Sequence, residues 1–341
     1  MDTLDLTAVR TDLGLDEGQR GWLDALATAG EPPAPLRLPP PRQAAALLAQ
    51  LGVDPLDVRE VVGTLPSPEG QPALWWLLQR SAHLMRRHMG DIDTDLGWPR
   101  LPAALGAHGR FFLVYLFLAI LDDVQAWHQA HGVDTATSWE SLSALALDMR
   151  LRRALHGEGG LFEHGWITLP FRACLYALGR LQYTPLRLTE ARVRAWVDPT
   201  ELERIGPGSR PGDPAVGIHI PEAGPMPPED VDHSLRRARD LFARPAPWGP
   251  CRVAVCDSWL LDDQIAAYLP PASNIVRFQR RFTLFPRTEE GDRSVYNFVF
   301  HRSEAPASLD ELPQRTALER ALVTHLRAGG HWRTRTGWLA L

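Results

Sequence analysis

The chain has 341 residues, of which 45% are hydrophobic and 23% are charged, proportions typical of a soluble globular protein. Its 36 basic and 41 acidic side chains give a net charge of −5, so nucleic acid is not an expected partner. All the basic residues are arginine, which excludes chemistry that needs a lysine amine, such as Schiff-base catalysis or a Walker-type nucleotide site. A chain of this length is expected to form two domains.

The sequence shows neither the pattern of a membrane span nor that of a secretory signal. The most apolar run, Phe111–Leu121, is shorter than the roughly 20 residues that a membrane span needs, so it predicts a buried helix and no membrane. The first residues include Asp2 and Asp5 and lack the apolar core of a secretory signal, so we expect a cytoplasmic protein. The cysteines at 174, 251 and 256 suit neither a disulfide framework nor a zinc knuckle, and no metal site is predicted.

Residues 1–133 are predicted to form an all-helical domain. Apolar and amphipathic stretches follow one another with short links, and proline or glycine marks several of their ends. Asp54 and Pro55, for example, offer an N-cap followed by proline at the first helical position. The expected helices are Asp16–Ala29, Arg42–Leu51, Asp54–Val62, Pro72–Met89 and His108–Ala130.

Residues 134–341 are predicted to mix strands and helices, which makes the fold class α+β. The expected helices are Pro228–Arg244, Leu260–Leu269 and Ala317–Ala328, followed by an apolar tail through Trp332 and Trp338. Alternating or β-branched segments indicate the strands Leu181–Leu188, Val216–Pro221, Arg252–Cys256, Ile275–Phe285 and Val295–His301.

The first candidate site is the end of the predicted strand Val216–Pro221. His219 near that end, three residues before Glu222, is a candidate general base, although a histidine in a strand is also a common hydrogen-bonded core residue. The loop Glu222–Pro228 leads into a helix, whose first N–H groups can hold a phosphate. The loop contains a single glycine, Gly224, and several prolines, so an ordinary strand-to-helix turn is the alternative.

The second candidate site follows the predicted strand that ends at Cys256. Ser258 or Asp257 is suited to be the N-cap of the next helix. The alternative is a hydrolase in which Cys256 or Ser258 is the nucleophile and His219 the base.

Several blocks of sequence, taken together, resemble one protein family. They are the stretch from Gly217 through Met226, the stretch from Cys256 through Phe282, Gly179-Arg-Leu-Gln-Tyr, and Ala328-Gly-Gly-His-Trp. They look like a bacterial family of two-domain acyltransferases, in which a helical N-acyltransferase-type domain precedes a GNAT-like domain with a mixed sheet flanked by helices. The resemblance covers nearly the whole chain.

The resemblance implies roles for particular residues. Strand Val216–Pro221 takes the place of the strand beside which acyl-CoA pantetheine runs, with a backbone N–H as oxyanion donor, and Glu222–Pro228 takes the place of the pyrophosphate loop. His219 or Glu222 is then the expected base, and Tyr268 the acid that protonates the leaving thiolate. Ser258 is a further catalytic candidate, and the expected cofactor-binding residues are Ile218, Ile220, Gly224, Met226 and Asn274.

The expected function is therefore acyl transfer from a thioester, with acyl-CoA or acetyl-CoA as cosubstrate, to an amine or hydroxyl of a small molecule. The chain departs from the superfamily in one place, since the usual Arg/Gln-x-x-Gly-x-Gly/Ala loop is absent and prolines replace N–H donors. That departure favours the alternative of a non-catalytic GNAT-like protein that binds a small molecule.

Overall fold

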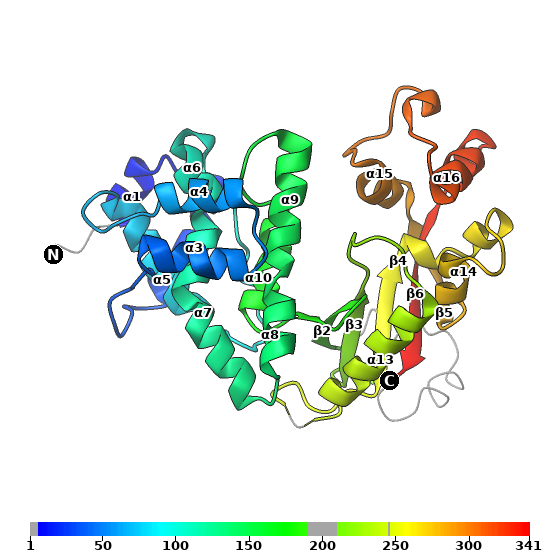
Figure 1. Ribbon diagram of the computed structural model, residues 1–341, viewed down its shortest axis with the longest axis horizontal. Coiled ribbons are helices and arrows are strands. Elements are labelled where there is room, and N and C mark those ends of the chain that lie inside the picture. Colours follow the sequence, from blue (N-terminus) through cyan, green and yellow to red (C-terminus); the bar gives the residue numbers. More distant parts are fainter. Residues whose placement is uncertain (1–5, 190–209, 245) are drawn as a thin grey trace. The chain divides into compact units, whose positions relative to one another are not determined.

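The computed structural model describes residues 6–189, 210–244 and 246–341 (Figure 1). Its contacts divide the chain into a helical unit, Met1–Ala177, and a second unit, Leu178–Leu341, which holds a mixed sheet with flanking helices. This arrangement confirms the predicted α+β class. The sequence placed the domain boundary after residue 133, whereas the structural division falls after 177, because three more helices pack within the helical unit.

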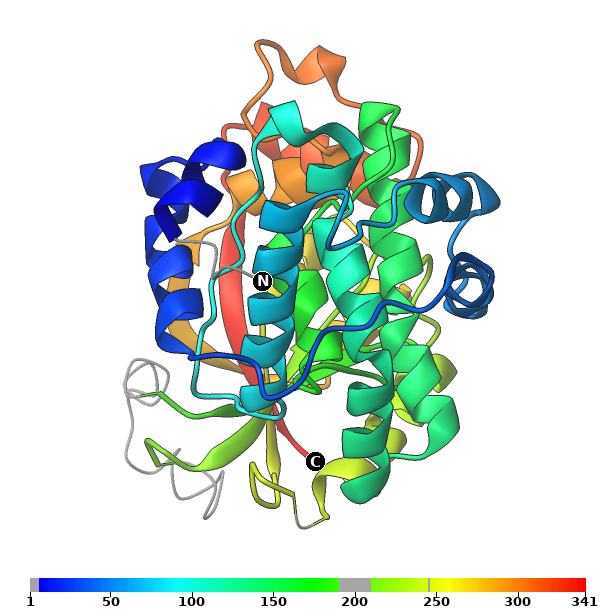
Figure 2. The ribbon, with the colours of Figure 1, turned by 90° about the vertical axis from the view of Figure 1, so that its left-hand side faces the viewer.

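The helical unit is built on one buried helix, α7, which contacts α5, α6, α8 and α10. The helices of this unit, coloured from blue to green in Figure 2, are α1 (Leu6–Asp12), η1 (Glu17–Gln19), α2 (Arg20–Thr28), α3 (Pro41–Gln50), α4 (Pro55–Gly63), α5 (Pro72–Arg87), η2 (Ala103–Leu105), α6 (Gly106–Arg110), α7 (Phe112–Ala130), α8 (Thr135–Leu142), α9 (Ala144–His156) and α10 (His164–Phe171).

The predicted apolar helix around Phe111–Leu121 lies in the core. Phe117 of α7 stacks on Phe171 of α10, with ring centroids 4.0 Å apart, and nearly every side chain of the run is buried. By length and composition alone the segment Ala103–Ala130 is long and apolar enough to cross a membrane. Most of that window is buried inside the protein, as it is in the core helix of a soluble domain.

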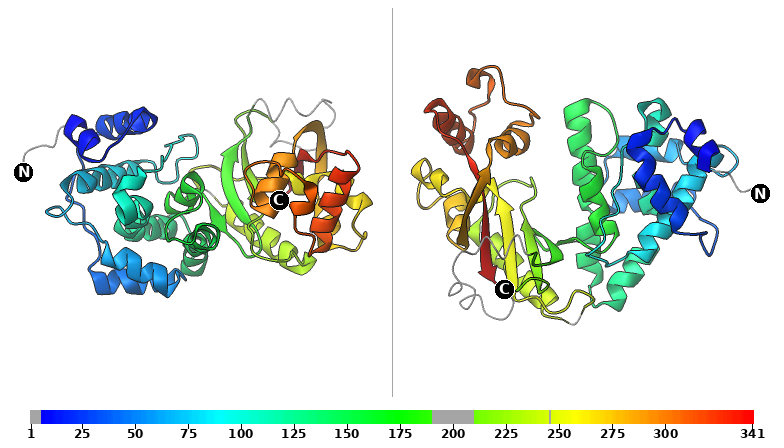
Figure 3. Two further views of the ribbon diagram at one scale, coloured as in Figure 1. Left: turned by 90° about the horizontal axis from the view of Figure 1, so that it is seen from above. Right: turned by 180° about the vertical axis from the view of Figure 1, so that it is seen from behind.

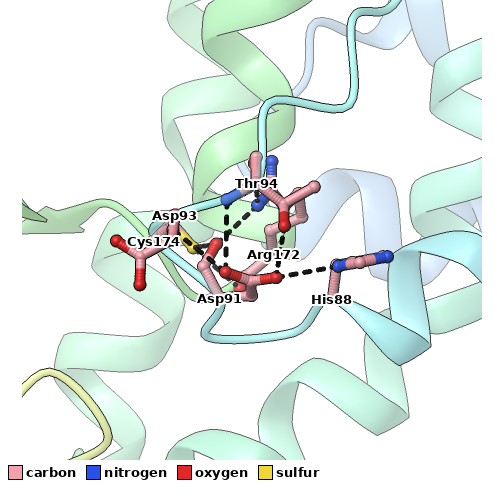
Figure 4. A network of polar contacts seen from close by, with 6 residues as sticks. All are labelled: His88, Asp91, Asp93, Thr94, Arg172 and Cys174. Atoms are coloured by element: carbon pink, nitrogen blue, oxygen red, sulfur yellow. Dashed lines mark hydrogen bonds and ion pairs between the residues drawn. The ribbon is translucent and has the colours of Figure 1, made fainter.

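A polar network fastens the loop after α5 to the end of the helical unit (Figure 4). The Asp91 carboxylate accepts hydrogen bonds from His88 Nδ1 at 2.8 Å and Thr94 Oγ1 at 2.7 Å, and from two backbone N–H groups. The buried Arg172 guanidinium donates to the carbonyl oxygens of Asp91 and Thr94. Burial opposes ionisation of Asp91, but its hydrogen bonds outweigh that effect and hold its pKa well below the usual range.

The second unit contains most of a six-stranded sheet with the order β1-β2-β3-β4-β6-β5. Strands β4, β6 and β5 lie side by side, as the right-hand view of Figure 3 shows. Only β3 and β4 are parallel among the described pairs; β2–β3, β4–β6 and β6–β5 are antiparallel. The strands are β1 (Tyr176–Ala177), β2 (Gln182–Arg187), β3 (Pro214–His219), β4 (Val253–Ser258), β5 (Thr283–Glu290) and β6 (Arg333–Ala340).

The helices of the second unit are α13 (Pro228–Phe242), η3 (Trp259–Leu261), η4 (Asp263–Ala267), α14 (Asn274–Gln279), α15 (Asp292–Phe300), η5 (Leu309–Glu311) and α16 (Ala317–Arg327). Helix α13 packs on β2, where the Tyr183 hydroxyl lies 2.9 Å from the buried Ser234 Oγ and the Tyr183 ring contacts Phe242. The buried residues of this helix are Val231, Ser234, Ala238, Leu241 and Phe242.

Two predicted strands are wrong. Ile275–Phe285 begins as α14, because Ser273 caps a helix by accepting a hydrogen bond from the Val276 N–H, and the strand β5 starts only at Thr283. Val295–His301 belongs to α15, in which Val295, Tyr296 and Phe300 form a helical stripe facing the core. Both segments are rich in β-branched and aromatic residues, so tertiary packing has overridden local propensity.

The predicted helix Leu260–Leu269 and the predicted apolar tail also differ from the structure. The helix is split into η3 and η4 at the buried Asp262, whose carboxylate accepts the N–H groups of Gln264 and Arg333. The tail after Trp332 is strand β6, which lies between β4 and β5. Its alternating Arg and Thr residues gave it no apolar strand signal.

Candidate active site

The parallel strands β3 and β4 pair over a short distance and then each runs on. Their register comprises Val216 with Ala254 and Gly217 with Val255, whereas β3 continues to His219 and β4 to Ser258. The outer edges of both strands remain paired to the end, β3 with β2 and β4 with β6. The ends of β3 and β4 therefore face each other where their mutual ladder has stopped, a geometry suited to an extended ligand.

His219 is held at the end of β3 by a neighbour on β2. Its Nε2 lies 2.8 Å from Thr184 Oγ1, and the ring is half-buried. Gly217, on the same face of β3, makes room for this pair: a Cβ there would stand 2.6 Å from Thr184 Oγ1 and 3.1 Å from His219 Nε2. The strand thus presents an imidazole in a fixed orientation, as a general base requires.

The loop after β3 contains Glu222, Gly224 and Met226. Gly224 has a φ of +83°, a conformation that favours glycine, and Met226 is buried. Glu222 is exposed, and its Oε1 lies 3.3 Å from Nε2 of His301. His301 caps α15 with a φ of +51°, which is unusual for a residue other than glycine. Glu222 therefore faces a histidine that the sequence had placed in a strand.

Tyr268 contacts a histidine on α16. Its hydroxyl lies 3.0 Å from His325 Nδ1, while His325 Nε2 lies 3.3 Å from the carbonyl oxygen of His331. In a neutral imidazole the nitrogen facing a carbonyl carries the proton, so Nδ1 accepts and the Tyr268 hydroxyl donates. Trp332 packs on the His325 ring at 4.2 Å, and a Cβ on Gly330 would stand 2.4 Å from that ring. Residues of the Gly-Gly-His-Trp block therefore pack around His325, the histidine that contacts the Tyr268 hydroxyl.

The remaining predicted residues lie at three places. Ser258 is the N-cap of η3, where its Oγ accepts the N–H of Leu260. Asn274 is the first residue of α14, and Ile218 and Ile220 lie at the end of β3, with Ile218 buried.

Cys174, Cys251 and Cys256 are all buried, and burial raises the pKa of Cys174 to about 11 and that of Cys251 to about 12. No cysteine is therefore placed as an accessible thiolate nucleophile.

The structure brings His219, Ile218 and Ile220 together at the end of β3, with Glu222, Gly224 and Met226 in the loop that follows. Ser258 ends the neighbouring strand, whereas Tyr268 and Asn274 belong to the segments after it. No group of three or more metal-ligating side chains occurs in the ranges that the structure describes.

Four residues that contact this region are not among the site residues predicted from the sequence: Arg180, Thr184, His301 and His325. Arg180 lies inside the Gly179-Arg-Leu-Gln-Tyr block that carried the resemblance. Thr184 lies opposite Gly217 in the β2–β3 register, which no local pattern reveals. His301 and His325 come from helices far along the chain.

Both parts of the chain match known families. Residues 42–173 match the family described as the N-acyltransferase N-terminal domain, and residues 175–339 match the GNAT-like C-terminal domain. Among curated proteins no relative matches.

Solved structures match the whole chain. An acyltransferase in complex with decanoyl-CoA is 41% identical, with a TM-score of 0.86. An acyltransferase with decanoyl-CoA and teicoplanin is 40% identical, with a TM-score of 0.85, and a tryptophan-to-alanine variant with octanoyl-CoA is 40% identical, with a TM-score of 0.86. Each match covers 99% of this chain and 100% of the other. This chain belongs to the same acyltransferase family.

Membership of the acyltransferase family confirms the expected acyl transfer and counts against the non-catalytic alternative. The two matched families meet between residues 173 and 175, close to the structural division after Ala177. The acyltransferase therefore carries the end of β3, the loop after it and Tyr268 in its GNAT-like half.

Proposed function

We propose that this acyltransferase moves an acyl chain of about eight to ten carbons from CoA to an amine or hydroxyl of a glycopeptide related to teicoplanin. The observation that carries the proposal is 40–41% identity, over the full length of both chains, to acyltransferases with octanoyl-CoA, decanoyl-CoA and teicoplanin. An acyltransferase in complex with CoA and 10C-teicoplanin, 40% identical, also supports it.

In this proposal His219 is the general base. The acceptor gives its proton to an imidazole nitrogen as its nitrogen or oxygen attacks the thioester carbonyl, and Thr184 holds the ring in orientation. Glu222, whose Oε1 lies 3.3 Å from Nε2 of His301, is the alternative base, acting through water. The exposed position of Glu222 and the fixed, half-buried ring of His219 favour His219.

The remaining steps need an oxyanion donor and an acid. A backbone N–H near the end of β3 is proposed to stabilise the oxygen of the tetrahedral intermediate. When the C–S bond breaks, the thiolate of CoA takes a proton and leaves, while the acyl carbon keeps its new bond to the acceptor. Tyr268 is the proposed proton donor. A Tyr268 hydroxyl that donates to His325 Nδ1 must rotate its O–H away from that nitrogen to donate to sulfur.

The CoA molecule is proposed to run beside the end of β3. Ile218 and Ile220 would contact its pantetheine arm, and Gly224 and Met226 lie in the loop toward its phosphates. Asn274 on α14 and Ser258 on β4 are proposed to line the opposite side. The ladder between β3 and β4 stops at Gly217 and Val255, and this supports the placement because an extended amide-containing arm needs strand edges to bond with.

The experiment offers the purified protein CoA thioesters of two to sixteen carbons together with teicoplanin-type acceptors, including the deacylated form. Mass spectrometry reads the acylated acceptor, and a thiol reagent reads the released CoA. The proposal predicts one released thiol for each acyl group gained, with the highest kcat/KM near eight to ten carbons.

Three outcomes would count against parts of the proposal. Thiol release without an acylated acceptor would favour hydrolysis, and His219→Ala and Ser258→Ala would then identify the responsible group. A maximum at two carbons would reject the chain-length part. Acylation of other amines or alcohols, with none of the glycopeptides, would reject the acceptor class.

A further inference from the structure

The guanidinium of Arg180 donates three hydrogen bonds to the loop after β3. Its Nη1 donates to the carbonyl oxygen of Pro221 at 3.1 Å, its Nη2 to that of Gly224 at 2.7 Å, and its Nε to that of Pro225 at 2.8 Å. One side chain thus spans both ends of the segment 221–225. The planar fork of arginine allows this, since its N–H groups point in fixed and divergent directions.

Arg180 is itself anchored to the element into which the loop leads. The N–H of Leu181 donates to Ser234 Oγ of α13 at 3.3 Å, and the Tyr183 hydroxyl lies 2.9 Å from the same oxygen. Gly179, with a φ of +86°, turns the chain at this point and lies near α13. The Gly179-Arg-Leu-Gln-Tyr block therefore connects the loop, the start of β2 and α13 through hydrogen bonds.

The loop has an unusual shortage of backbone donors. Positions 221, 225, 227 and 228 are prolines, and the N–H of Ala223 is bonded to the carbonyl oxygen of Pro221. Glu222, Glu229 and Asp230 add negative charge around it. The path of such a loop is not determined by a ladder or by its own N–H groups, so it depends on the side chain that binds its carbonyl oxygens.

Arg180 also brings a positive charge to this acidic segment. Among the residues that the structure describes, no carboxylate lies within ion-pair distance of its guanidinium, and its three bonds go to carbonyl oxygens. Two of the five N–H groups, one on each terminal nitrogen, are not used in these bonds. Burial lowers its pKa, but a guanidinium remains charged at neutral pH.

We propose that Arg180 is a positioning residue for CoA, which shapes the loop 221–225 so that the loop accepts the phosphate-bearing end of the cosubstrate. The inference rests on the proposed function. Arg180 fixes the path of a loop that has few N–H groups of its own, and it brings one positive charge beside that loop. Because the proposed role of the loop is to accept the phosphates, the effect of Arg180 is expected mainly at the nucleotide end of the donor.

The test compares acyl-CoA with the matching acyl-pantetheine, which lacks the nucleotide and its phosphates. Arg180→Ala is expected to raise KM for acyl-CoA about tenfold or more, the loss for one charge-assisted bond, while KM for acyl-pantetheine changes less than about twofold. Arg180→Lys keeps the charge but lacks the fork, and it is expected to resemble Arg180→Ala. Arg239→Ala on the exposed face of α13 is the control for loss of one positive charge and is expected to match the wild type.

The outcomes distinguish a failure of the Arg180 proposal from a failure of the proposed acyltransferase function. Equal losses with both donors would overturn the inference by showing a general structural role, and so would wild-type KM in either Arg180 variant. If Arg180→Ala does not fold, Arg180→Lys alone carries the comparison. A wild-type enzyme that uses neither donor would instead reject the proposed function.

Discussion

The Nε2 atom of His219 lies 2.8 Å from the Oγ1 atom of Thr184, across the antiparallel pair of β2 and β3. Because Gly217 has no Cβ, the two side chains meet directly above its backbone. This contact fixes one imidazole nitrogen at the point where β3 and β4 stop pairing. It is the main reason to assign the proton transfer to His219, and it leads to the first two predictions.

Replacing His219 by alanine should lower kcat/KM for acyl transfer by about 10²–10⁴, the usual contribution of a general base. The substitution also removes the contact with Thr184, so a melting curve of the variant checks that it folds. Steady-state assays of the variant and the wild type measure kcat and KM separately. Unchanged turnover would transfer the role of base to Glu222, which Glu222→Gln then tests.

A methyl group at position 217 should disturb the contact between Thr184 and His219. In Gly217→Ala the new Cβ would stand 2.6 Å from Thr184 Oγ1, so the threonine and the imidazole must move apart. We expect kcat to fall about tenfold or more, with a stability loss of about 1–3 kcal/mol from overpacking. Thr184→Val is the matched variant, since it removes the hydroxyl without adding bulk. Full activity in both variants would show that the orientation of His219 is unimportant.

Tyr268→Phe removes the proposed acid and leaves the ring in place. We expect kcat to fall by about 10–10² with little change in KM, because only the protonation of the leaving thiolate is affected. The unfolding free energy should drop by about 1 kcal/mol through the lost bond to His325. Kinetics and urea denaturation measure the two effects separately. A stability loss without a kinetic loss would make Tyr268 a structural residue.

His128 should make the helical unit sensitive to acid. Burial, with a smaller effect of His131, lowers its pKa to about 4, and its Nε2 has no partner in the described part of the chain. The unfolded chain, with a pKa near 6.5, binds more protons between pH 6.5 and 4, so stability is present above this window and lost as the pH falls through it. The loss from this residue is at most about 3 kcal/mol.

Urea denaturation of wild type and His128→Gln at pH 7, 5.5 and 4 checks this prediction. The difference between the two proteins should shrink or reverse as the pH falls. Asp148, whose pKa burial raises to about 6, acts in the opposite direction, but it is present in both proteins and cancels. A difference that is constant with pH would contradict the low pKa of His128.

Asp91→Asn should loosen the network that ends the helical unit. The carboxylate accepts bonds from His88, Thr94 and two backbone N–H groups, and asparagine keeps only one acceptor oxygen. We expect a loss of about 1–3 kcal/mol in unfolding free energy at pH 7. Because the native pKa of Asp91 is lowered, the loss should be full above about pH 4 and shrink progressively as the pH falls below that, where the unfolded chain binds a proton before the native carboxylate does. A loss that stays constant between pH 5 and pH 2 would indicate a packing effect instead.

Local patterns in the sequence determined α2, α3, α4, α5 and α7 of the first unit, the strands β2, β3 and β4, and helix α13. In each of these, the period of the apolar residues agrees with the surface that the element buries. The blocks around Gly217 and Cys256 also indicated the family, so acyl transfer followed from the sequence.

Only the tertiary structure decided the rest. β6 is polar in sequence and becomes a strand because β4 and β5 supply its hydrogen-bonding partners on both sides. α14 and α15 are rich in strand-forming residues and become helices because their buried stripes face the core. The partners of the candidate site residues, Thr184, Arg180, His301 and His325, lie between 35 and 79 positions away from them in the chain. Contacts across such distances are set by the packing of whole elements, which no local period encodes.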